Sequence, residues 1–495
     1  MKKPPSATAL AGVFAACAIS FALSGCKVGP NYARPAAPAP TAWKAEDPWR
    51  PSDPRDQIPK GEWWKVFGDE DLTALETQSM AANQSLKAAV AQLDQARALA
   101  KLSTAGLFPQ MNVAPSGQGA RESGNRPFTG LANPSAITQP TYTLPFTVTW
   151  ETDLFGRVRR QIESAQAQYQ AAGADLENVR LMISSELAGD YFTLRELDEE
   201  ISVLDRTVES LQRGLQLVQD RFKGGVASGL DVAQEQTLLD TTRSQAILLG
   251  QQRVQFEDAI GTLTGQPASN FKIAVKPMPS SLPVIPTGVP TDLLERRPDI
   301  AAAERQMAGA NAQIGVAQSA YYPDLSLSGG FGQQTFNLAR IANLTSSYWA
   351  VGAALTEAVL TGGARRAQVQ YAQATYDVTV ANYRQSVLTA FQEVEDNLAG
   401  LGVLSKAADA QAQAVQDAQR ALDIATNRYK GGLVNYLDVV TAQQALLSNQ
   451  QLAAQIEGER LTTSVLLVKA LGGGWDASSI AALRVSYPVK QALQP

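Results

Sequence analysis

The chain has 495 residues, a formal net charge of −5, no histidine and only two cysteines, Cys17 and Cys26. This composition removes the commonest general base and the commonest neutral metal ligand, and two cysteines near the N-terminus build neither a disulfide framework nor a cysteine metal site. An acidic chain without basic runs also argues against nucleic acid as a partner.

The N-terminus has the pattern of a targeting signal followed by a lipid anchor. Two lysines precede an apolar run over 7–23 that ends Leu-Ser-Gly before Cys26. Small residues before a cysteine here resemble the bacterial lipobox, whose cysteine is acylated, although an ordinary signal peptide with an incidental cysteine is the alternative. We expect residues 1–25 to be the signal peptide and 26–61 an acylated, extended linker. Lys27 in place of an aspartate favours sorting to the outer membrane.

The rest of the chain consists of two copies of one unit. The stretch RFKGGVASGLDV at 221–232 recurs as RYKGGLVNYLDV at 428–439, an offset of 207 residues. The same offset aligns Tyr169 with Tyr376, whereas further upstream the offset becomes 214. An offset that is constant over whole helices and changes only once indicates a duplicated unit with a loop of variable length. The predicted boundaries are 62–264 and 297–475 for the two repeats, 265–296 for an equatorial connector and 476–495 for a C-terminal tail.

Each repeat predicts the same order of elements: a helix, a strand region, a very long helix, a tip and a medium helix. The predicted helices are 83–107, 157–223 and 230–264 in the first repeat, and 297–321 and 364–430 in the second. A helix of this length spans about 100 Å at 1.5 Å per residue. Heptad spacing on both sides of the first tip predicts coiled-coil packing. The helices alone leave open a plain antiparallel bundle or a curved wall.

The tips are predicted where paired glycines interrupt the helices. Gly224 with Gly225, and Gly431 with Gly432, are expected to supply the positive φ that stops a helix.

Strands are predicted from period-two alternation. Residues 141–150 read TYTLPFTVTW, with apolar side chains on one face and mostly threonines on the other, and 111–113, 325–331 and 349–356 alternate similarly. Transmembrane β-strands show this pattern, although a half-buried soluble sheet produces it too. Four strands cannot close by themselves, and open edges are not tolerated in lipid. Three chains would supply twelve strands, so we expect a homotrimer.

Four motifs together resemble the outer membrane factor (TolC-like) family, and most closely its NodT-type lipoproteins of RND efflux. They are CKVGPNY from Cys26, LERRPDI from Leu293, the duplicated Gly-Gly tip with Leu-Asp-Val, and KALGGGW from Lys469. The resemblance implies an α+β membrane protein with an internal repeat. Its outer-membrane β-barrel, with four strands per chain and twelve in the trimer, would continue into a long periplasmic α-helical barrel.

The resemblance also implies the function and the partners. The trimer would be the exit duct of a tripartite efflux system in a Gram-negative bacterium, passing drugs, toxic compounds or ions. Its tips, marked by Gly224, Gly225, Gly431 and Gly432, would meet a periplasmic adaptor protein, which links to an inner-membrane RND transporter.

By motif match, the resemblance places the periplasmic gate at the second tip. Leu437 and Asp438 would form constricting rings, with Tyr429 lining the neck. Thr441 and Gln444 stand where related channels carry the partners of a salt-bridged lock, so closure would rest on packing and hydrogen bonds. The alternative for Asp438, and the favoured role for Asp231, is a first-turn acid at the positive end of a helix.

Two other functions remain open from the sequence: the same fold in type I protein secretion, and a coiled-coil lipoprotein scaffold without a pore. An enzyme is not expected, because the sequence has no histidine, no Gly-x-Ser-x-Gly motif, no P-loop and no cluster of metal ligands. We expect no metal and no cofactor beyond a covalent lipid on Cys26.

Overall fold

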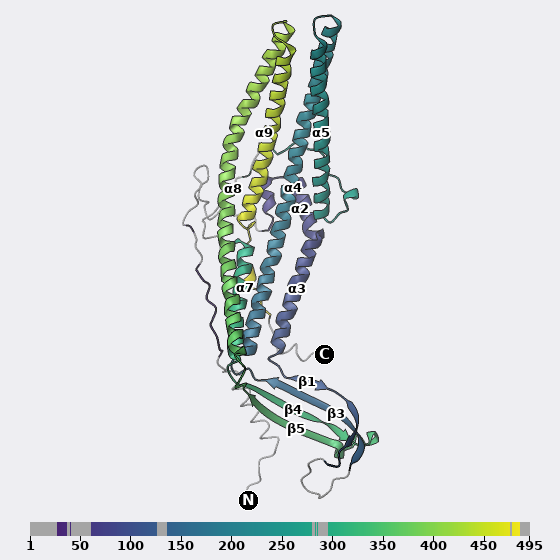
Figure 1. Cartoon of the computed structure of the whole chain (residues 1–495), viewed down its shortest axis with the longest axis vertical. Coiled ribbons are helices and arrows are strands. Elements are labelled where there is room, and N and C mark those ends of the chain that lie inside the picture. The colour runs from purple at the N-terminus through teal and green to yellow at the C-terminus, as the bar shows by residue number, and fades with distance from the viewer. Residues whose placement is uncertain are drawn as a thin grey trace.

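Two helices of 67 residues run the length of the molecule and end at a small antiparallel sheet (Figure 1). The computed structural model describes residues 27–36, 40, 61–125, 136–279, 283, 285, 296–475 and 478–485. The first repeat contains η1 (Trp63–Phe67), α2 (Glu70–Ala82), α3 (Gln84–Ala105), β1 (Gln110–Val113), β2 (Ser116–Glu122), β3 (Ile137–Glu151), α4 (Arg157–Lys223) and α5 (Gly229–Leu263). The second contains α7 (Pro298–Ser319), β4 (Asp324–Thr335), η4 (Leu338–Arg340), η5 (Leu344–Ser346), β5 (Ser347–Thr356), α8 (Ala364–Lys430) and α9 (Tyr436–Ala470). Short helices η2 (Ala268–Asn270) and α10 (Ser478–Ala481) follow the two repeats.

The shorter helices are stacked in pairs beside the long ones. Figure 1 shows α3 and α5 end to end along α4, and α7 and α9 end to end beside α8. At the first junction Ser79 Oγ and Asn83 Nδ2 both donate to the carbonyl oxygen of Leu263, at 3.0 and 2.9 Å. The helical column therefore has four helices per chain along its whole length: α4, α5, α8 and α9 towards the tips, and α3, α4, α7 and α8 towards the sheet. No helix among the described residues is long and apolar enough to cross a membrane.

The predicted helix over 83–107 is confirmed as α3, but the helix α2 that directly precedes it was not predicted. Asn83 ends α2 and begins α3, and its side chain accepts a hydrogen bond from the Leu86 N–H at 3.0 Å. The main hydrophobic core lies at this height, where the buried Tyr191 and Phe192 of α4 meet η1 and the start of α2. This core holds the column together at its equator.

The sheet has the strand order β1-β3-β4-β5. β1 and β2 pair with β3 in one register and are separated only by Ala114 and Pro115, so they form one strand interrupted where proline supplies no N–H. The four predicted strands are confirmed, as two hairpins joined through β3 and β4. Neither β1 nor β5 has a second strand partner among the described residues, so the sheet is open at both sides.

The two faces of the sheet differ as the alternation predicts. Across the four strands, one row of paired residues is wholly apolar: Val113, Phe146, Phe331 and Trp349. The next row on the opposite face contains small or polar residues: Asn112, Thr147, Gly330 and Ala350. The Phe146 and Phe331 rings stack with centroids 4.9 Å apart, and Trp349 is 79% exposed. An exposed apolar face of this kind suits a hydrocarbon environment.

Candidate functional site

The two helical hairpins end in the same Schellman turn. At the first tip the Val226 N–H donates to Arg221 O and the Gly225 N–H donates to Phe222 O, both at 2.9 Å. The second tip repeats this, with Leu433 N–H donating to Arg428 O at 2.9 Å.

Only the second glycine of each pair has a positive φ. Gly225 and Gly432 have φ of 74° and 73°, where L side chains are strained, whereas Gly224 and Gly431 have φ of −78°. The prediction that both glycines supply positive φ is therefore wrong for the first of each pair.

The helices that leave the tips are capped differently. In the first repeat Ser228 and Asp231 form a reciprocal capping box, with each side chain accepting from the other residue's N–H. The expected capping role of Asp231 is confirmed. In the second repeat Asn435 makes no side-chain cap, and the Asp438 carboxylate forms no hydrogen bond or ion pair within the described ranges. Asp438 does lie in the first turn of α9, as its alternative role of a first-turn acid predicts, but its carboxylate caps no N–H among the described residues and is available to another partner.

Three of the four predicted gate residues lie on the surface of the second tip. Leu437 is 54% exposed, and Asp438 and Thr441 are exposed as well. Thr441 Oγ1 donates to the Leu437 carbonyl oxygen at 2.8 Å, so this hydroxyl is occupied within the helix. Gln444, on the next turn, is also exposed. These side chains form one accessible strip at the start of α9.

Tyr429 is the exception. Its side chain is only 6% exposed, and its ring packs 4.8 Å from the ring of Tyr436 and 4.8 Å from the Arg221 guanidinium carbon. The expectation that Tyr429 lines the neck is therefore wrong within this chain: it joins the second hairpin to the first. Arg221 Nη1 also donates to Lys430 O at 3.4 Å, across the same boundary.

A buried carboxyl that the sequence did not single out lies next to this contact, on the side away from the tips. Glu235 of α5 is fully buried, and Gln443 Nε2 of α9 donates to its Oε1 at 3.4 Å. Burial raises the pKa of Glu235, while hydrogen bonds from Tyr436 and Gln443 lower it. Gly214 of α4 makes room for this group, because a Cβ there would lie 2.3 Å from Glu235 Oε1. Only the glycine at 214 could have indicated such a close approach.

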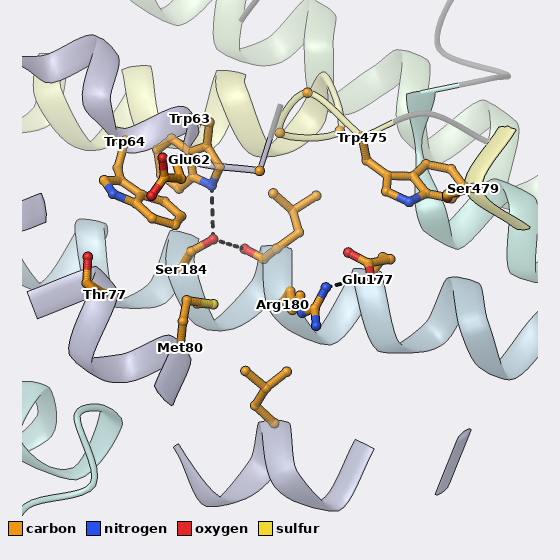
Figure 2. A pocket seen from close by; sticks show the side chains of 16 residues that line it. Glu62, Trp63, Trp64, Thr77, Met80, Glu177, Arg180, Ser184, Trp475 and Ser479 are labelled. Atoms are coloured by element: carbon orange, nitrogen blue, oxygen red, sulfur yellow. Dashed lines mark hydrogen bonds and ion pairs between the residues drawn. The ribbon is translucent and has the colours of Figure 1, made fainter. Parts of the chain in front are cut away.

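A pocket of about 640 Å³ lies at the equator, between the turn at 472–475 and α4 (Figure 2). Trp63 Nε1 donates to Ser184 Oγ at 3.0 Å across it, and Ser184 Oγ donates to Leu181 O. Arg180 pairs with Glu177 on the same helix at 2.8 Å. The Nε1 atoms of Trp64 and Trp475, by contrast, are buried without a hydrogen-bond partner among the described residues. No group of metal-binding side chains occurs among those residues.

The segment that follows Cys26 is held against the helices, although Cys26 itself lies outside the described residues. Arg160 of α4, fully buried, donates from Nε to Val28 O at 2.9 Å and from Nη2 to Gly29 O at 2.8 Å. A Cβ on Gly29 would lie 2.4 Å from the Cα of Gly315, so only glycine fits. The Val28 N–H donates to Phe155 O, where β3 joins α4. The segment after Cys26 therefore docks where the sheet meets the helices.

Comparison with known proteins identifies the family. The model of the "Outer membrane efflux protein" family matches residues 75–266 and 289–473, which is most of the chain. The chain belongs to the outer membrane efflux protein family. It is 31% identical to the toluene efflux pump outer membrane protein TtgF of Pseudomonas putida, over 93% of this chain and 96% of the relative. It is 32% identical to the pyoverdine export outer membrane protein OpmQ of Pseudomonas aeruginosa, over 84% and 88%.

Solved structures of efflux channels share the fold. The outer-membrane channel OprN has a TM-score of 0.84 at 30% identity, over 91% of this chain and all of that one. VceC of Vibrio cholerae has a TM-score of 0.78 at 28% identity, over 84% and 99%. This outer membrane efflux protein is therefore an efflux channel of the Gram-negative outer membrane that extends into the periplasm.

Proposed function

We propose that this outer membrane efflux protein is the homotrimeric exit duct of a tripartite system, which receives small molecules from an RND transporter through a periplasmic adaptor. The observation that carries the proposal is one open, four-stranded sheet with an apolar face, continuous with two hairpins that end in matching tips. The relatives named for toluene efflux and pyoverdine export support small molecules as cargo.

In a trimer, the edge strands that one chain leaves unpaired would pair with those of the neighbouring chains. β1 with β2 forms one edge and β5 the other, and unpaired backbone groups are costly in hydrocarbon. Three copies would supply twelve strands, enough to enclose a lumen. The same symmetry would arrange six hairpin tips in a ring.

The tips are suited to contact with the adaptor. Each carries an exposed apolar residue directly after its glycines, Val226 at the first and Leu433 at the second. The glycines themselves allow a partner to approach the backbone, because a Cβ on Gly225 or Gly432 would meet nothing within 4 Å.

Deleting the gene tests this proposal in cells. The deletion strain should accumulate a fluorescent hydrophobic dye, and the restored gene should lower its accumulation. Unchanged dye accumulation, combined with loss of a secreted protein, would contradict efflux and support type I secretion.

In the proposed gate, Leu437, Asp438 and Thr441 from three chains surround the channel axis at the second tip. The support is the exposed strip at the start of α9 and the carboxylate of Asp438, which has no partner among the described residues. Three carboxylates around one axis attract cations and repel one another.

Replacing Asp438 with asparagine should lower the cation preference of the open channel at least about twofold, because three fixed charges leave the constriction. The measurement is the reversal potential of single channels under a KCl gradient. The matched control is Asp231→Asn, which removes the same charge from the corresponding position. It should leave selectivity unchanged, and its amide oxygen can still accept the hydrogen bond from the Ser228 N–H. An unchanged reversal potential in Asp438→Asn would contradict a luminal ring.

We further propose that Cys26 carries the lipid. The docked segment from Lys27 to Asn31 supports this, because it lies beside the joint between β3 and α4, where an acyl chain would reach the membrane. Replacing Cys26 with alanine should abolish incorporation of labelled palmitate, whereas Cys17→Ala should retain it. Labelling that persists in Cys26→Ala would exclude this site.

A further inference from the structure

The two joints between the sheet and the long helices differ in whether their arginines have acidic partners. In the first repeat residues 152–156 connect β3 to α4, and in the second residues 357–363 connect β5 to α8. At the repeat offset of 207, Asp153 corresponds to Leu360 and Arg159 corresponds to Arg366. The second joint therefore keeps the arginine and replaces its acid with leucine.

The first joint supplies its own anions. Asp153 Oδ2 accepts from Arg159 Nε at 3.0 Å, and the same carboxylate accepts from the N–H groups of Val158 and Arg159 at 2.8 and 3.0 Å. Glu151, at the end of β3, pairs with Arg157. The basic residues at the start of α4 are thus neutralised within the chain.

The second joint has cations without such partners. Arg365 and Arg366 lie in the first turn of α8, and neither forms an ion pair within the part of the chain that the structure describes. Arg365 lies over the Tyr321 ring, 5.8 Å from its centroid. Just before them, Val359 and Leu360 are 94% and 92% exposed. An apolar surface and two available guanidinium groups therefore lie within one short segment.

We propose that Val359, Leu360, Arg365 and Arg366 bind an anionic phospholipid at the periplasmic surface of the outer membrane. The acyl chain contacts the two apolar side chains, and the phosphate binds the two arginines in the role that Asp153 has in the first repeat. The position fits this ligand, because the apolar sheet ends and the helices begin here (Figure 1). Guanidinium matches a phosphate in charge and in its paired donors. The exposed Glu357 precedes this segment and forms no ion pair with it among the described residues.

Native mass spectrometry of the delipidated channel in detergent tests the site. The probes are phosphatidylglycerol and phosphatidylcholine with identical acyl chains. The wild type should prefer phosphatidylglycerol. Arg365→Gln with Arg366→Gln should lower that preference about 30-fold per chain, since each arginine near an anionic lipid surface contributes roughly 5-fold. Lys406→Gln with Arg420→Gln, on the exposed surface of the same helix, removes the same charge and should leave the preference unchanged.

A second variant tests the site without removing its arginines. Leu360→Asp restores the acid that the first repeat carries and should abolish the preference by occupying Arg366. A preference that survives both variants, or that falls equally in the control, would overturn the proposal. Complete displacement of the lipid by excess inorganic phosphate would also overturn it, since the site would then bind free phosphate alone.

The contact between the acyl chain and the apolar side chains is tested by a separate measurement. A nitroxide on Val359→Cys should be accessible to oxygen dissolved in the bilayer. Protection from oxygen would mean that a second copy of the chain covers this joint, which would contradict lipid binding there.

Discussion

Alanine at Gly472 should prevent the channel from folding stably. Gly472 follows α9 with φ of 88°, and a Cβ there would lie 2.1 Å from the carbonyl oxygen of Arg296. The obstructing atom belongs to the backbone at the start of the second repeat, where Arg297 Nη1 donates to Ala470 O at 3.1 Å and to Glu393 at 2.6 Å. Relieving the clash would separate these groups, so we expect a loss of more than about 4 kcal/mol.

The measurement is the amount of folded channel in the outer membrane together with its apparent unfolding temperature. Gly68→Ala is the matched control, because Gly68 also has a positive φ, of 64°, but its Cβ would meet nothing within 4 Å. That variant should lose only the backbone strain of about 1–2 kcal/mol. Equal effects in the two variants would mean that the contact with Arg296 contributes nothing.

The stability of the chain should fall as pH rises, and Glu76 should cause much of that fall. Glu76 of α2 is fully buried, and neither carboxylate oxygen has a hydrogen-bond partner within the described ranges. Burial raises its pKa from 4.5 to about 9. Between these values the folded chain keeps a proton that the unfolded chain releases. The free energy of unfolding therefore decreases by up to about 1.4 kcal/mol per pH unit.

Glu76→Gln removes this titration, so the difference between wild type and variant isolates it from other buried acids such as Glu235. Denaturant unfolding at a series of pH values should give a difference that grows with pH over this window. Glu70→Gln, exposed on the same helix, should follow the wild type throughout. A Glu76→Gln curve parallel to the wild type would show that the carboxyl is hydrated in the folded chain.

The long helices and the strands could be predicted from the sequence because their signals are local. Both 67-residue helices have the predicted bounds, since glycines adjoin them at each end and apolar residues repeat between. The amphipathic sheet follows from strict alternation, with one apolar face across all four strands. The start of α3 at residue 83 was predicted, whereas α2 was not, because a helix of 13 residues contains few repeats of an apolar pattern.

The site could be predicted only in part, because burial between hairpins is not a local property. Heptad spacing places Tyr429 on an inner face of α8 but gives no sign that Arg221, 208 residues earlier, covers its ring. The twin acids also look equivalent in sequence. Ser228 completes a capping box with Asp231, whereas Asn435 makes no side-chain cap and leaves Asp438 available. The exchange of the capping Ser228 for Asn435 thus distinguishes a structural acid from a proposed gate residue.

Single-channel recording in planar bilayers tests the central claim most directly. The purified chain should assemble into channels that give discrete, unitary and cation-preferring currents, with the preference reduced in Asp438→Asn. A membrane-inserted protein that gives no unitary currents would contradict the account, because it would be a lipoprotein scaffold without a pore.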